Sequence, residues 1–189
     1  MRRGARFLQI LGILLILASL GLLAGLKVSE ARARQNTTAV TERMTQLLEL
    51  RISGVMGEGP MPTLELNGRD YAALLEVPGL NMTLPVCDDW ESRSEVANPC
   101  RYWGSVYEGN LILGGGRMAQ LEFCAMLDLD DRIVITDLQG REFVYKVDSI
   151  LRRDDVTFDK LREGEYPLTI FTSDGSSGRS IVVHCGLPE

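Results

Sequence analysis

Short runs of apolar and β-branched residues, separated by turn-forming residues, fill the chain from Thr63 onward. The last two runs cover residues 168–171 and 181–183, and the segment between them is small, polar and rich in glycine and serine. Runs of this length are typical of strands buried on at least one face, and such a segment is typical of an exposed loop. Residues 132–137 and 142–149 flank a Leu-Gln-Gly turn and predict a β-hairpin. Many short strands at regular spacing indicate an all-β barrel or sandwich.

The remaining patterns predict further strands and only a few helices. Residues 80–86 and 110–113 read as strands. Residues 69–75 and 157–161 are each predicted to form a helix of one or two turns. The one longer helix is predicted over residues 36–51, which begin with capping residues and carry a loose apolar stripe.

Residues 7–26 carry no charge and contain a single glutamine. As a helix this segment would be about 30 Å long, enough to cross a bilayer. A cleaved signal peptide is the alternative, because Arg2, Arg3 and Arg6 precede the segment. The apolar run exceeds the ~7–15 residues usual for the core of a signal peptide, which favours an uncleaved anchor. Basic residues flank both ends in equal number, so charge alone does not set the orientation.

The charge of the chain is unevenly distributed. Residues 1–34 hold six of the 20 basic and one of the 26 acidic residues, so the rest of the chain has 14 against 25, a net charge of −11. Such an acidic domain repels phosphate backbones, and nucleic-acid binding is not expected. The acidic run at 128–131 lacks the glycine and closing glutamate of a calcium loop, so no metal and no cofactor are predicted.

Four cysteines lie outside the apolar segment. An even number permits disulfides. Cys87 and Cys100 bracket a single loop, residues 88–99, and form the pair we predict. Buried free thiols are the alternative for a scattered set of this kind.

Several segments, taken in order, resemble one family of enzymes. They are Leu84-Pro85-Val86, Pro99-Cys100-Arg101-Tyr102-Trp103-Gly104-Ser105, residues 110–115, residues 130–145, Thr169-Ile170-Phe171-Thr172-Ser173, and residues 179–185. Their order and spacing are similar to those of sortases, the membrane-anchored cysteine transpeptidases of Gram-positive bacteria, and especially to class B-like clostridial sortases. The resemblance covers residues 61–185 and implies a closed, eight-stranded β-barrel with short helices.

These patterns divide the chain into four parts, and the resemblance implies where each part lies. Residues 1–6 would be a cytoplasmic basic tail, 7–26 a transmembrane anchor, 27–60 a helical stalk and linker, and 61–189 the sortase-like barrel. The barrel would then be extracellular and face the cell wall.

Sortases use a cysteine nucleophile, a histidine acid/base and an arginine that holds the oxyanion. At the matching positions this chain has Ser173 for the cysteine and Gly116 for the histidine. Counting without gaps places the arginine position at Ser180, whereas a one-residue loop deletion or a bulge would place Arg179 there. The candidate lining of a peptide groove comprises Gly115, Gly116, Thr172, Ser173 and Arg179.

These replacements predict a pseudo-sortase without catalytic activity. Glycine cannot move a proton, and a serine hydroxyl needs a positioned base. The chain's one histidine, His184, is expected outside the cleft. The predicted role is to bind a sorting-signal peptide or a partner in cell-wall or pilus assembly. The alternatives are an atypical transpeptidase or hydrolase that uses Ser173, and an ectodomain with a purely structural role.

Overall fold

The computed structural model describes residues 35–48, 61–91, 97–115, 121–154, 156–173 and 180–188, together with Leu15, Ser19 and Arg32. The strands are β1 (Leu64–Leu66), β2 (Arg69–Val77), β3 (Met82–Cys87), β4 (Cys100–Trp103), β5 (Leu111–Gly114), β6 (Arg132–Asp137), β7 (Glu142–Arg153), β8 (Leu168–Ser173) and β9 (Ser180–Gly186). The short helices are η1 (Pro78–Leu80), η3 (Glu122–Ala125) and α2 (Phe158–Arg162).

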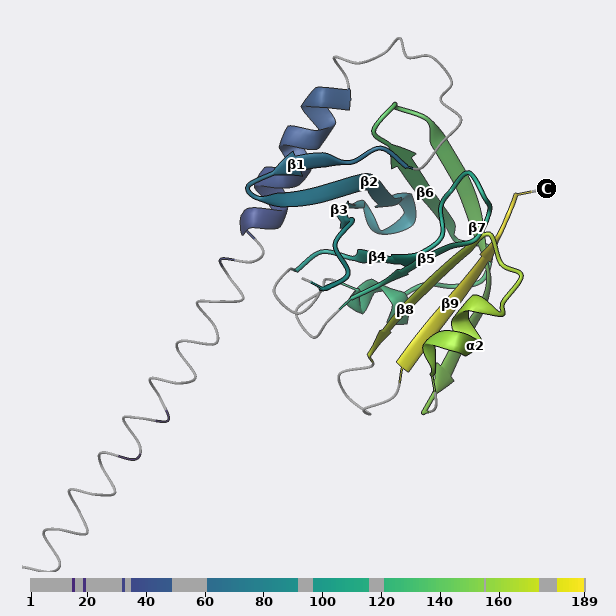
Figure 1. The fold of residues 1–189 in the computed structure, drawn as a ribbon. Coiled ribbons are helices and arrows are strands. Elements are labelled where there is room, and N and C mark those ends of the chain that lie inside the picture. The colour runs from purple at the N-terminus through teal and green to yellow at the C-terminus, as the bar shows by residue number, and fades with distance from the viewer. Residues whose placement is uncertain are drawn as a thin grey trace, which may run out of the picture.

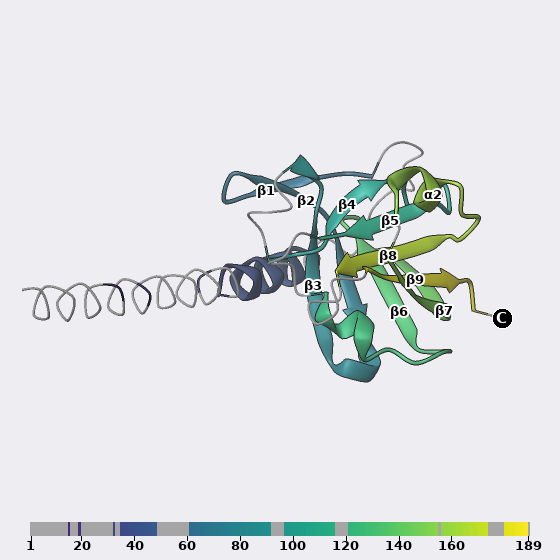
Figure 2. The same ribbon diagram turned by 90° about the horizontal axis from the view of Figure 1, so that it is seen from below.

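The strands form one closed sheet. Their order is β1-β2-β3-β4-β5-β8-β9-β7-β6, and β6 also pairs with β2, which closes all strands except β1 into a barrel (Figures 1 and 2). Closure satisfies the backbone groups that an open sheet would leave at its edges. The predicted eight-stranded barrel with few short helices is confirmed.

The predicted hairpin is present as β6 and β7, and β7 continues to Arg153 because its second half pairs with β9. The helix predicted near 157–161 is also present, as α2. The helix predicted at 69–75 is wrong, because these residues belong to β2. Leu74 packs outside the barrel while Leu75 packs inside it, so apolar residues follow one another as they do in a buried helix.

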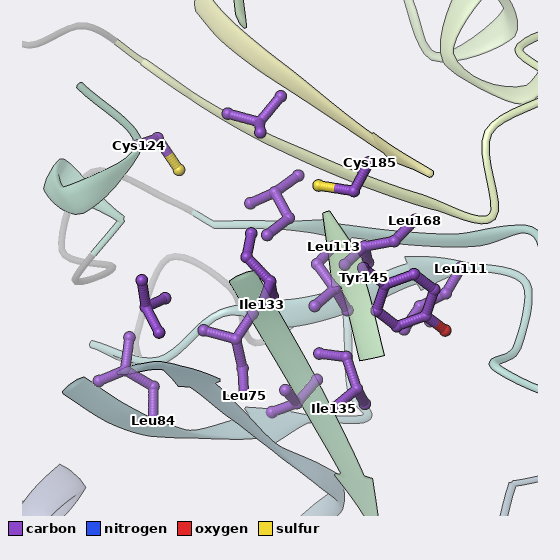
Figure 3. Close-up of a cluster of buried hydrophobic side chains, with 14 of the residues drawn as sticks. Leu75, Leu84, Leu111, Leu113, Cys124, Ile133, Ile135, Tyr145, Leu168 and Cys185 are labelled. Carbon is purple, nitrogen blue, oxygen red and sulfur yellow. The ribbon is translucent and has the colours of Figure 1, made fainter. Parts of the chain in front are cut away.

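The main core fills the barrel, and Figure 3 shows part of it. Alternate residues of each strand point inward, as Ile133 and Ile135 do in β6 and Leu168 and Ile170 in β8. All four are fully buried. The barrel interior is therefore packed with side chains, and any ligand site must lie on its outer surface or at its ends.

A second, smaller core lies between the barrel and the helix that precedes it. Residues 35–48 are helical and run beside β1 and β2 (Figure 1). Val40 and Met44 are buried in this contact, against Tyr71 and Leu74 of β2 among others. The helix predicted at 36–51 is thus present in its described part, and its apolar stripe faces the barrel.

A buried polar contact also holds this helix. The Thr37 hydroxyl donates to Asn98 Oδ1 at 2.6 Å, and Asn98 Nδ2 donates to the Tyr71 hydroxyl at 3.4 Å.

The predicted anchor at 7–26 lies outside the described residues except for Leu15 and Ser19, both of them helical. Among the helices that the structure describes, none is both long enough and apolar enough to cross a membrane.

Candidate functional site

Three segments that resemble the sortase motifs meet at one edge of the barrel. β5 and β8 are parallel neighbours, with Gly114 opposite Phe171, so their C-terminal ends lie side by side (Figure 2). β9 starts at the same edge, where Ser180 is paired with Ser173.

The predicted site residues are placed as follows. Gly115 comes directly after β5 and is half-buried, and Ser173 is the last residue of β8. Thr172 shares a strand face with Ile170 and is buried, so it faces the barrel interior. Gly116 and Arg179 lie outside the described residues. The choice between Arg179 and Ser180 for the arginine position stays a prediction.

Next to this edge lies an aromatic cluster that the sequence analysis did not identify. It consists of Trp90, Tyr102 and Phe171, which are all half-buried. The ring centroids of Trp90 and Tyr102 are 5.0 Å apart, and those of Tyr102 and Phe171 are 6.0 Å apart, both edge-to-face. This geometry is favoured for aromatic pairs. Phe171 precedes Ser173 by two residues, so the cluster adjoins the candidate site.

Arg162 places a positive charge on the border of the aromatic cluster. This residue ends α2, and its guanidinium lies 5.1 Å from the ring centroid of Tyr102 and 5.9 Å from that of Trp103. Both distances are within the range of cation–π contacts. Trp103 is 39 % exposed, so an aromatic and cationic surface is open to solvent here.

Gly114 is required for the position of Phe171. A Cβ atom on Gly114 would lie 2.4 Å from the phenyl ring, because the ring rests directly on the β5 backbone. Only a residue without a side chain lets the strand end and the aromatic cluster approach this closely.

We therefore expect Gly114→Ala to lower the free energy of unfolding by about 1–3 kcal/mol, through overpacking that displaces Phe171. Urea unfolding followed by tryptophan fluorescence measures the change. Gly79→Ala is the matched control, since a Cβ there meets one atom at 3.9 Å. If Gly114→Ala and Gly79→Ala lose equal stability, the close contact between Gly114 and the Phe171 ring is contradicted.

His184 lies far from Ser173. It is on β9 opposite Thr169, four positions before Ser173 on β8, which is ~13 Å along the strand. Its Nδ1 is 3.2 Å from the Thr169 hydroxyl, and its ring stacks on Tyr166 at 4.2 Å. Burial, and then Arg153, lower the pKa of His184. This histidine lines a separate cavity of about 260 Å³ under α2 and cannot reach Ser173.

Cys124 and Cys185 offer no substitute for the missing nucleophile. Cys124 and Cys185 are buried in the main core. Burial raises the pKa of Cys124 to about 12 and also raises that of Cys185, so both stay protonated near neutral pH. Cys87 and Cys100 are free thiols in the structure, and their predicted disulfide is not formed there.

Across the described residues, no group of three or more His, Cys, Asp or Glu could hold a metal ion.

Comparison with known proteins bears on the fold. No protein-family model matches the sequence, and no curated protein sequence does either. Among solved structures, a Clostridium perfringens sortase D5 transpeptidase matches with a TM-score of 0.56 at 15% identity, over 82% of this chain and 98% of that one. Sortase A of Listeria monocytogenes matches with a TM-score of 0.53 at 17% identity, over 63% and 88%.

The chain has the sortase fold. Sortase E1 of Streptomyces coelicolor, solved with a tripeptide in its active site, matches with a TM-score of 0.51 at 21% identity, over 63% of this chain and 88% of that one. The sortase-like barrel predicted from the sequence is therefore confirmed. The class B-like subtype stays a prediction.

Proposed function

We propose that this protein is a membrane-anchored, extracellular sortase-like protein that binds a sorting-signal-like peptide and does not cleave it. One observation carries the proposal. The strand ends of the sortase fold that would supply the nucleophile and the acid/base meet at one edge, and the chain has Ser173 and Gly116 at those positions.

The absence of turnover follows from the chemistry of these residues. A serine hydroxyl is scarcely ionised near neutral pH and needs a base within hydrogen-bond reach. His184 is ~13 Å away along the strand, and no other histidine exists in the chain. Loss of one triad member typically lowers the rate about 10⁴-fold, and here two are replaced.

Peptide binding is supported by the surface beside Ser173. The aromatic cluster offers apolar rings, and Arg162 adds a cation within an otherwise acidic domain. Aromatic anchors and arginine are the side chains that most often dominate peptide and protein interfaces. A peptide that lies along β5 and β8 would contact Tyr102 and Phe171 before it reaches Ser173. The apolar segment 7–26 would keep the barrel at the outer face of the membrane.

The test uses the full-length chain in detergent micelles and fluorescent sorting-signal-like peptides. We expect saturable binding in fluorescence anisotropy and no cleavage product by chromatography. Tyr102→Ala should raise the Kd at least about 10-fold by removing a central aromatic anchor. Tyr166→Ala is the matched control, because Tyr166 stacks on His184 away from the aromatic cluster, and its Kd should be unchanged.

Two outcomes would overturn the proposal. Cleavage by the native chain that Ser173→Ala abolishes would make the protein an atypical serine transpeptidase or hydrolase. Absence of binding to every peptide would leave the barrel as a structural ectodomain or as the surface for a cell-wall or pilus partner.

A further inference from the structure

The seam between β3 and β4 is the weakest junction in the barrel. These strands share a single register pair, Cys87 opposite Cys100, whereas each other neighbouring pair that the structure describes shares at least three. One further backbone bond, from Cys87 N to Pro99 O at 2.8 Å, supports the seam. The barrel is thus closed here by few contacts, and two cysteines stand at the closure.

The geometry of the pair fits a disulfide. Residues opposite each other on neighbouring strands lie ~4.8 Å apart and project to the same side of the sheet. This separation falls within the ~4.4–6.8 Å between Cα atoms that a disulfide spans. The two thiols also interact in the structure, and the hydrogen bond from Cys100 lowers the pKa of Cys87.

The surroundings connect this pair with the candidate site. Residues 88–99 lead from Cys87 to Cys100, and Trp90 of the aromatic cluster belongs to this segment. An ion pair between Asp88 and Arg101 spans the seam one position further on. A covalent bond between the cysteines would fix both ends of the segment that presents Trp90 to Tyr102.

We propose that Cys87 and Cys100 are an oxidation site, joined by a disulfide while the exported chain folds. The thiolate of one cysteine of the pair attacks the disulfide of an extracellular thiol–disulfide oxidoreductase and forms a mixed disulfide. The thiolate of the other cysteine then attacks the first cysteine's Sγ and releases the oxidoreductase as a dithiol, so two electrons and two protons leave the pair. The inference depends on the proposed extracellular location only for the source of this oxidant.

Burial sets the order of these events. Both cysteines are fully buried, in the second core to which Met44 of the helix at 35–48 also belongs. Exchange therefore has to take place before this helix packs against the barrel. Once formed, the bond is shielded from thiol reductants until the domain opens.

The test compares oxidised and reduced forms of the full-length chain after refolding with and without a glutathione redox buffer. We expect the oxidised form to be about 2 Da lighter by intact mass, with peptide mapping that joins Cys87 to Cys100. Its Tm should be higher by about 5–10 °C, because the bond restricts the unfolded chain. Without denaturant, dithiothreitol should leave the bond intact.

Matched variants assign the effect to this pair. The difference in Tm between the two forms should persist in Cys124→Ala/Cys185→Ala and disappear in Cys87→Ala/Cys100→Ala. Four free thiols after oxidative refolding, another pairing, or equal Tm values would each overturn the inference. Peptide affinity is measured separately, so a disulfide without peptide binding would contradict the proposed function alone.

Discussion

Asp137→Ala is expected to lower the free energy of unfolding by about 2–4 kcal/mol. The Asp137 side chain is fully buried where β6 turns into β7. Its carboxylate accepts four hydrogen bonds, from the Tyr107 hydroxyl at 2.7 Å, Arg141 Nε at 2.8 Å, and the backbone amides of Gln139 at 2.8 Å and Arg141 at 2.9 Å. Removing it leaves the two backbone amides and the Tyr107 hydroxyl without their acceptor, whereas the Arg141 side chain is partly exposed and can turn to water.

The Asp137 carboxylate also affects the titration of Tyr107. Burial, and then the hydrogen bond to Asp137, raise the pKa of Tyr107 to about 12. Urea unfolding followed by tryptophan fluorescence measures the stability. Asp131→Ala is the matched control, since Asp131 also caps a turn, accepting from the Asp128 amide at 2.8 Å, but at an exposed site. It should lose less than about 1 kcal/mol. Equal losses in the two variants would contradict the structural role of the Asp137 network.

The second large effect is expected from restoring the missing chemistry. Ser173→Cys/Gly116→His should cleave a bound sorting-signal-like peptide at least about 10⁴-fold faster than the native chain. Cysteine has a pKa near 8.5 and histidine near 6.5, so both groups can take part near neutral pH. Product formation by chromatography, at peptide concentrations above the Kd, measures the gain.

Variants of this double substitution separate its components. Ser173→Cys alone should remain nearly inactive, because no histidine lies within reach of position 173. Adding Arg179→Ala to the double variant tests whether Arg179 holds the oxyanion, and activity should then fall at least about 10²-fold. A double variant that binds the peptide with native affinity but does not cleave it would contradict this prediction. The site would then lack a further catalytic group besides the nucleophile and the acid/base.

The sequence by itself determined the class of fold and the chemistry of the candidate site. The β6–β7 hairpin, α2 and the final two strands are visible in local patterns, because alternation and turn residues depend on near neighbours in the chain. The identities at positions 116 and 173 are likewise a matter of sequence alone. The order of the motifs is sufficient to predict the sortase-like barrel.

Only the tertiary structure decided which distant segments meet. β2 has the local pattern of a short helix because its two faces pack against different cores, inside and outside the barrel. The aromatic cluster joins residues from the segment after β3, from β4 and from β8. Cys87 and Cys100 also face each other only because the barrel closes between β3 and β4. Local propensity carries no information on these contacts, because strand pairing across the barrel is selected by the packing of the whole core.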